Sequence, residues 1–358
     1  MKIRIFLCLF FFGFLNNYSN SLHADSIKRK KVIFSSYVES YYGIDFNFPS
    51  DNNRPSFIYN HKSLNEIAIN LAFLKVSLNK DYYRLNLGLM GGTYSSVNLV
   101  TEPGVLKNIY EANVGFKLSR RRNLWLDMGV FHSHLGFESL QSFDNLTLSR
   151  SLSAENSPYY ETGMKLTFTS NDSRFLYSIL AVNGWQHMKR PVSSIYPALG
   201  MQFQYSTKNF LFNYSNFAGN EKPDSVPQYR FFHNFHVCLS KGKFQFFQGF
   251  DIGFEQSYTG SASYFNWYVP TSMVKYSFSS KWSTTFRYEY FTDPEGIVLS
   301  SAKGNIEGYS VNVDFKPLGN LLLRLEGKFF NSSSNSIYQD AVFFKQNTSY
   351  LFSLSTKF

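Results

Sequence analysis

The strongest constraint on the fold is a period of two in the placement of apolar side chains along short segments of the chain. In the last segment, residues 350–358, Tyr350, Phe352 and Leu354 alternate with positions that are mainly polar, and the segment ends on Phe358. Successive side chains of a β-strand point to opposite faces, so this segment is a strand with one apolar and one polar face. Strands of about ten residues with this alternation are typical of a transmembrane β-barrel. The same alternation recurs at residues 110–118, 282–290, 309–316 and 321–328.

The connections between the strands alternate in length, which is a second and independent signal. Short polar turns are expected near residues 79–81, 119–123, 170–173, 206–209, 241–242, 279–281 and 317–320. Longer connections rich in Asn, Ser, Gly and Pro are expected near residues 44–63, 96–107, 136–157, 185–195, 218–228, 257–263, 293–305 and 331–345. Seven short turns and eight long loops separate sixteen strands. Bacterial barrels have even strand numbers, short periplasmic turns and long extracellular loops. The pattern therefore predicts an all-β, antiparallel transmembrane barrel of about 16 strands, with both termini on the periplasmic side.

Composition excludes several other classes of protein. Aromatic residues make up 19% of the chain and charged residues 17%, whereas disordered chains have few aromatics and many charges. No segment after the N-terminal leader offers the roughly 18 consecutive apolar residues of a membrane-spanning helix. An exported β-sandwich would also alternate, because the alternation alone does not say which face is inside. The regular exchange of short and long connections, together with the terminal aromatic residue, favours the barrel.

Residues 1–24 have the features of a secretory signal peptide. Basic residues precede an apolar run, residues 5–15, that is too short to cross a bilayer. A polar stretch then ends at Ala24, where we expect cleavage. Removing this segment lowers the formal net charge from +10 to +8 and leaves one cysteine, Cys238, so no intramolecular disulfide is expected. The predicted division is a signal peptide followed by one β-barrel domain, residues 25–358.

The strand positions that alternate with the apolar ones carry charges of both signs. A charge on the lipid face costs up to about 2–4 kcal/mol at the bilayer centre, so these side chains are expected to face the interior. Rings of charge in a water-filled pore filter ions and solutes. We therefore expect an open lumen that passes small hydrophilic solutes; the alternative is a plugged barrel in which the charges neutralise one another. The predicted pore-lining charges are Arg84, Glu111, Lys117, Asp127, Glu161, Lys165, Asp251, Glu255, Arg287, Glu289, Asp314, Arg324, Glu326 and Lys328.

Other functions have weaker support in the sequence. The basic net charge comes without any nucleic-acid-binding module, so no nucleic acid is expected as a partner. A hydrolase is suggested by His132, Ser133 and His134, but neighbouring strand residues point to opposite faces, so His132 and Ser133 cannot pair. His233 and His236 are separated in the same way, and no metal or cofactor motif occurs. We expect no catalytic residue, no metal and no cofactor. A plugged or narrow barrel acting as a surface adhesin or receptor is the main alternative.

Two stretches resemble the OmpL-like β-barrel porin family. The first is YVESYY at residues 37–42, followed by NEIAINLA at residues 65–72. The second spans residues 136–163 and contains GFE, SRS and SP in that order. The layout is similar over residues 35–358. The resemblance implies an outer-membrane channel of a Gram-negative bacterium, and sixteen-stranded porins are trimers, so a homotrimer is implied by analogy.

The longest predicted connection resembles the inward-folded constriction loop of porins. Its charged candidates are Glu138, Asp144, Arg150 and Glu155. The alternative is an ordinary extracellular loop.

The last strand resembles the assembly signal of bacterial outer-membrane proteins, carried here by Tyr350, Phe352, Leu354 and Phe358. This resemblance implies the barrel-assembly machinery as a partner during insertion. Outer-membrane lipid surrounds such a barrel, and basic loops would attract anionic lipopolysaccharide.

Overall fold

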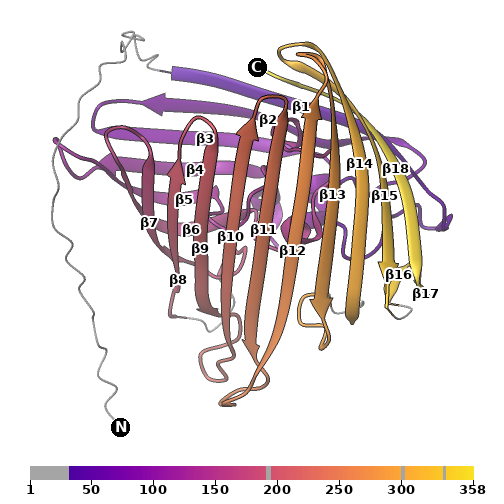
Figure 1. The fold of residues 1–358 in the computed structure, drawn as a ribbon. Coiled ribbons are helices and arrows are strands. Elements are labelled where there is room, and N and C mark those ends of the chain that lie inside the picture. The colour runs from indigo at the N-terminus through magenta and orange to yellow at the C-terminus, as the bar shows by residue number, and fades with distance from the viewer. Residues whose placement is uncertain (1–31, 191–194, 300–302, 334–335) are drawn as a thin grey trace. The chain divides into compact units, whose positions relative to one another are not determined.

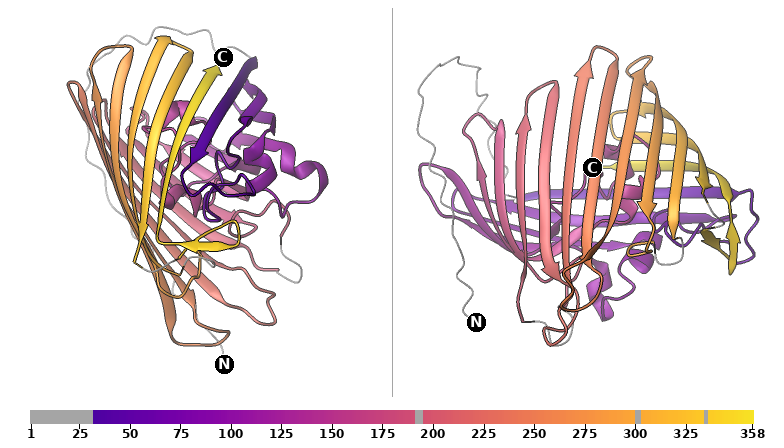
Figure 2. Two further views of the ribbon diagram at one scale, coloured as in Figure 1. Left: turned by 90° about the vertical axis from the view of Figure 1, so that its right-hand side faces the viewer. Right: turned by 60° about the horizontal axis from the view of Figure 1, so that its bottom comes forward.

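The chain folds into a closed β-barrel. The computed structural model describes residues 32–190, 195–299, 303–333 and 336–358, so the predicted signal peptide, residues 1–24, lies outside the described residues. Within the described ranges, sixteen strands form one antiparallel barrel (Figure 1). The barrel closes where β1 (Val32–Asp45) pairs with β18 (Gln346–Lys357), which lie side by side in Figure 2. At this seam Ser36 and Phe358 exchange backbone hydrogen bonds of 3.0 and 2.9 Å. The predicted fold class is confirmed.

Consecutive barrel strands pair with each other around the wall. Between β1 and β18 these strands are β2 (Ile67–Asn79), β3 (Tyr83–Gly91), β4 (Ile109–Lys117), β5 (Asn123–His132), β6 (Tyr160–Thr169), β7 (Phe175–Val182), β8 (Ala198–Ser206), β9 (Phe210–Asn220), β10 (Tyr229–Lys241), β11 (Phe244–Gln256), β12 (Tyr264–Ser277), β13 (Trp282–Asp293), β14 (Gly304–Leu318) and β15 (Leu321–Ser332).

The remaining elements are short and lie in the long connections. A two-stranded hairpin, β16 (Ile337–Gln339) with β17 (Val342–Phe344), lies between β15 and β18. The helical turns are α1 (Thr93–Asn98), η1 (Gly104–Asn108), η2 (Ser142–Asp144) and α2 (Leu152–Glu155). None of the helices in the described residues has the length and apolar character needed to cross a membrane.

The two ends of the barrel differ in their connections. Short turns join β2 to β3, β4 to β5, β6 to β7, β8 to β9, β10 to β11, β12 to β13 and β14 to β15. We call this the turn end, and both β1 and β18 have their outer termini there. The long connections emerge at the opposite end, which we call the loop end. The predicted alternation of short and long connections is confirmed.

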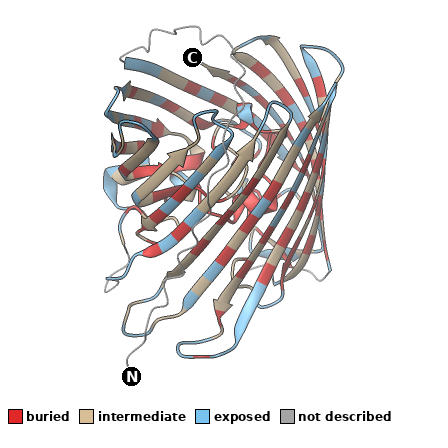
Figure 3. Cartoon of the chain, turned by 60° about the vertical axis from the view of Figure 1, so that its left-hand side comes forward, coloured by how far each residue is buried: buried red, intermediate tan, exposed pale blue. Residues whose placement is uncertain are grey.

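The two faces of the wall differ in polarity. On β13, Ser283, Thr285 and Arg287 are buried in the barrel interior, whereas Trp282 and Phe286 are exposed on its outside. Figure 3 shows the same alternation of buried and exposed positions along other strands. The interior is polar and the outer surface is apolar, which is the reverse of a soluble sandwich. The β-sandwich alternative is therefore wrong, and closure of the sheet pairs the backbone groups that lipid would leave without partners.

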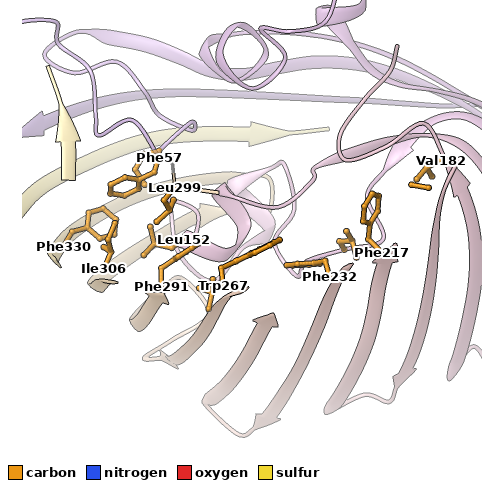
Figure 4. Packing of buried hydrophobic residues seen from close by; sticks show 14 of the residues in the cluster. Phe57, Leu152, Val182, Phe217, Phe232, Trp267, Phe291, Leu299, Ile306 and Phe330 are labelled. Atoms are coloured by element: carbon orange, nitrogen blue, oxygen red, sulfur yellow. The ribbon is translucent and has the colours of Figure 1, made fainter. Parts of the chain in front are cut away.

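A hydrophobic cluster lies inside the barrel toward the loop end. Phe57, from the connection between β1 and β2, packs there with Leu152 of α2 (Figure 4). The strands contribute inward-facing residues near their loop ends, among them Trp267, Phe291 and Phe330. Two of the long connections are therefore anchored in the interior by apolar contacts.

Candidate pore

The connection between β5 and β6 folds into the barrel. Residues 133–159 include η2 and α2, and Leu148, Ser151 and Leu152 are fully buried. We call this connection the inner loop. Ser151 caps α2, because its Oγ accepts a hydrogen bond from the Ala154 N–H at 3.2 Å. Glu138 in turn accepts the backbone N–H of Ser151 at 2.8 Å, which fixes the start of the helix.

Arginines on one side of the wall donate to the carbonyl groups of the inner loop. Arg324 donates from Nη1 to Thr147 O and from Nη2 to Asn145 O, both at 3.0 Å. Arg287 donates from Nη1 to Ser149 O at 2.8 Å. The loop has little regular structure of its own, so these side chains supply partners that buried backbone carbonyls require.

Carboxylates on the same strands accept from the amide groups of the inner loop. Glu326 accepts the Ser149 N–H at 2.5 Å, and Glu289 accepts the Leu152 N–H at 2.6 Å. The mixed signs of these side chains therefore match the alternating donors and acceptors of a peptide backbone. We call β13, β14 and β15 the loop-bound wall.

The charges of the loop-bound wall also neutralise one another. A buried charge is costly unless it is paired and hydrogen-bonded, and breaking such a pair leaves the other charge uncompensated. The three closest pairs are Arg287–Glu326 (2.8 Å), Lys328–Glu289 (2.9 Å) and Arg324–Asp314 (2.7 Å).

The other charges of the inner loop make separate contacts. Glu155 accepts the backbone N–H of Tyr59, in the connection between β1 and β2, at 2.8 Å. Arg150 is buried and donates to a carbonyl within the loop itself. Asp144 pairs with Lys357 of β18, where both side chains are partly exposed. The inner loop therefore contacts both the β1–β2 connection and the C-terminal end of β18.

Among the residues that the structure describes, the predicted charges on β3 to β6 donate no hydrogen bond to the carbonyls of the inner loop. The Nε of Arg84 lies 2.6 Å from Asp127 Oδ1, and Lys75 pairs with Glu111. Lys165 lies with its Nζ 4.2 Å from the centroid of an aromatic ring on β5. Arg84 and Lys75 are partly exposed, whereas their carboxylate partners are buried. We call β3 to β10 the open wall.

Three further predicted residues have different surroundings. Asp251 accepts from the hydroxyl of Ser153, in the inner loop. Glu255 accepts from Arg230 Nε at 2.7 Å near the loop end. Lys117 lies on the same face of β4 as the buried Glu111 and Asn113. The sequence pattern therefore placed the predicted side chains on one face of the wall but did not distinguish these surroundings.

Of the residues that suggested a hydrolase, His134 has both ring nitrogens in contact with other parts of the barrel. His134 Nδ1 lies 2.8 Å from Glu161 Oε2, and its Nε2 lies 2.7 Å from the carbonyl oxygen of Asn216. The hydroxyl of Ser133 accepts a local backbone N–H at 3.0 Å. Both nitrogens of His134 are engaged, so His134 is not placed to activate Ser133. In the part of the chain that the structure describes, no group of three His, Cys, Asp or Glu side chains is arranged to hold a metal ion.

Two cavities lie on either side of residues 154–158 of the inner loop. The larger cavity, about 430 Å³, lies against β8, β9 and β10 and is lined by Gln202, Gln204 and His236 among others. The outer cavity, about 320 Å³, is lined by residues of the long connections, including Trp185. Ser157 lines both cavities and therefore lies between the two spaces.

The charged groups around the outer cavity are paired. Arg230 lies between two tryptophan rings, with Cζ 5.2 Å from the centroid of Trp185 and 5.5 Å from that of Trp267. His187 Nε2 lies 2.9 Å from Glu221 Oε2. Burial opposes ionisation of Glu221, but the hydrogen bond and charge of His187 outweigh it and lower the pKa of this carboxyl below its ordinary value.

Several interior charges were missed by the sequence reasoning. Glu39 is buried on β1 and accepts from the hydroxyl of Ser142 in the inner loop. Glu39, Lys75 and Arg230 each occupy an interior position of a strand, so the period of two could have found them. Arg54 is also buried, but it lies in a connection, where no periodicity reports which side chains turn inward.

One known protein family matches the chain over all of the residues that the structure describes. The family described as "Putative beta-barrel porin-2, OmpL-like" matches residues 31–358. No curated protein matches the chain.

Solved porins share the fold at low sequence identity. An anion-selective porin from Comamonas acidovorans has a TM-score of 0.62 at 9% identity, covering 91% of this chain and 99% of that one. Salmonella typhi OmpF, in complex with daunomycin, gives 0.60 at 10% identity, covering 91% and 97%. The trimer form of Vibrio cholerae OmpT gives 0.58 at 8% identity, covering 91% and 99%. Because the family match extends over the whole barrel, the chain belongs to the OmpL-like family of β-barrel porins, and it is an outer-membrane porin.

Proposed function

We propose that this porin passes small hydrophilic solutes and ions by passive diffusion and catalyses no reaction. The loop end faces the outside of the cell and the turn end faces the periplasm. The observation that supports this best is the polar interior, crossed by an inner loop with a cavity on each side. On this proposal a solute passes from one cavity to the other beside Ser157, which lines both.

The predicted pore charges then have two different roles. One set holds the inner loop in place and the other lines the remaining space. We assign Asp251, Arg287, Glu289, Asp314, Arg324, Glu326 and Lys328 to the first role. We assign Arg84, Glu111, Lys117, Asp127 and Lys165 to the second role. Glu161 orients His134, and Glu255 orients Arg230. Glu138, Arg150 and Glu155 keep the loop folded inward, so that it constricts the pore.

Export and assembly complete the proposal. Residues 1–24 direct export and are removed after Ala24. Tyr350, Phe352, Leu354 and Phe358 are exposed on the outside of the barrel, where the assembly machinery would read them. The same outer face contacts lipid, and the long loops contact lipopolysaccharide. The trimer form of Vibrio cholerae OmpT, an outer-membrane protein, supports a homotrimer for this chain.

Single-channel recording tests this function. Purified protein beginning at residue 25 is inserted into planar bilayers, and folding is verified independently by heat-modifiable gel mobility. We expect stepwise, long-lived openings. A folded barrel without conductance would contradict the proposal. It would favour the surface adhesin or receptor, which the filling of part of the interior by the inner loop also supports.

A further inference from the structure

The larger cavity is lined by amide and aromatic side chains. Gln202 donates from Nε2 to Asn213 at 2.9 Å, which leaves its Oε1 available. The side-chain amide of Gln204 makes no hydrogen bond to any described residue. Gln141, from the inner loop, contributes a third amide to the lining and donates to Tyr110 Oη at 3.3 Å. These groups present both donors and acceptors to the cavity.

Aromatic rings lie on two sides of these amides. Tyr110 and His132 pack edge to face with their centroids 4.9 Å apart, and the side chain of His132 is 43% exposed. Across the cavity, Phe137 of the inner loop lies 5.9 Å from His236, centroid to centroid. Such rings offer flat apolar surfaces against which the C–H face of a ligand packs.

Charge is nearly absent from the free surface of this cavity. The carboxylate in its lining, Glu138, has a side chain that is only 3% exposed and holds Ser151 through Oε2. Its Oε1 lacks a hydrogen-bond partner among the described residues but lies 4.0 Å from Arg287 Nη1. The loop-bound wall, which carries most of the interior charge, lies behind the inner loop. At the outer cavity, Arg230 and Glu155 are already engaged.

We infer that the larger cavity is a transit site for neutral, hydroxyl-rich solutes of saccharide type. This inference rests on the proposed channel function and names its substrate class. Each hydroxyl is both a donor and an acceptor, so it matches an amide lining without an ion partner. An ionised solute would lose hydration without gaining a paired charge, which is costly. The volume of about 430 Å³ lies within the roughly 300–1,000 Å³ of small-molecule sites.

The experiment compares three solutes of nearly equal size in proteoliposomes containing the folded protein. The probes are a neutral hexose, the anionic hexuronate of that hexose and its cationic 2-amino sugar. Each is used at a concentration below saturation. Ion conductance is recorded in parallel on the same preparations. We expect the hexose to cross faster than both charged analogues.

The variants remove the amides while keeping the volume. In the double variant Gln202→Met, Gln204→Met, the flux of hexose is expected to fall about fivefold or more, the effect of losing one or two hydrogen bonds. Ion conductance is expected to stay within about twofold. The matched control is Gln346→Met, an exposed glutamine outside the cavity whose replacement leaves the hexose flux unchanged.

Each outcome has a defined meaning. Faster passage of the hexuronate or of the amino sugar through the wild-type protein would overturn the inference while leaving the channel function intact. An unchanged hexose flux in the double variant would overturn it as well. Absence of both conductance and solute flux in the folded protein would overturn the channel function itself, and the inference with it.

Discussion

The loop-bound wall and the open wall contain nearly the same ion pair in two different settings. Arg324 and Asp314 approach to 2.7 Å between Nε and Oδ1, and Arg84 and Asp127 approach to 2.6 Å between the same atoms. The side chain of Arg324 is 0% exposed and bonds three carbonyls of the inner loop, whereas that of Arg84 is 29% exposed. The same pair therefore serves as a structural anchor on one wall and lies within reach of water on the other.

Facing the interior of a barrel is therefore not the same as lining its pore. A charge that bonds the backbone of a folded-in loop is buried, so it contributes to stability and shape. On the opposite wall the cations Arg84 and Lys75 remain partly exposed, although their carboxylate partners are buried. Mutations at matched positions on the two walls test this distinction.

The largest effect is expected for Arg324→Ala. The change removes one charge of a buried pair together with its bonds to the inner loop, and breaking a buried pair costs about 3–5 kcal/mol. We expect the free energy of unfolding, measured by urea titration of the folded barrel, to fall by about this amount. We also expect single-channel conductance to rise, because the inner loop loses part of its attachment.

The matched control is Arg84→Ala on the open wall. Asp127 is buried beneath the partly exposed Arg84, and removing that side chain opens the carboxylate to water. The loss of stability is therefore expected to be smaller, about 1 kcal/mol, and the inner loop keeps its attachment. Equal losses of stability in the two variants, with equal changes of conductance, would contradict the division into two walls.

The period of two carried the sequence prediction as far as the faces of the strands. It placed Arg324 and Glu289 on the polar faces of their strands and Phe352 on an apolar face, because alternation follows from strand geometry alone. The cost of a charge in lipid then assigned the polar face to the interior. It could not show which interior charges the inner loop covers. That depends on contacts between distant residues: Arg324 bonds Thr147 across 177 positions in the chain. The burial of Glu155 also depends on a distant residue, because the carboxylate accepts from Tyr59 in another connection. Connections lack periodicity, so no sequence pattern reports such a contact.

A smaller effect concerns Lys62, in the connection between β1 and β2. Its Nζ donates to the carbonyls of Arg54 at 2.8 Å and Pro55 at 2.9 Å. Burial, aided by the charge of Arg54, lowers the pKa of Lys62 to about 8, below the ordinary lysine value of about 10.4. Between these values the unfolded chain binds more protons than the folded one, so stability rises with pH.

The test compares the wild-type protein with Lys62→Met in urea titrations from pH 7 to pH 10.5. Methionine carries no charge to bury, so the variant is expected to gain stability relative to the wild type at pH 7. That advantage should shrink as pH rises through about 8 and above. A difference in stability between the variant and the wild type that does not change with pH would contradict the lowered pKa of Lys62 in the folded protein.

The smallest effect is expected for Asp144→Asn, in η2 of the inner loop. Asp144 pairs with Lys357, but the two side chains are 41% and 37% exposed, and such pairs contribute about 0–1 kcal/mol. Stability should change by no more than this, and single-channel conductance should stay at the wild-type value, because the bonds from Arg324 and Arg287 remain. A rise in conductance comparable to that of Arg324→Ala would mean that η2 is held mainly through Lys357. The position of the inner loop would then depend on the seam between β1 and β18 rather than on the loop-bound wall.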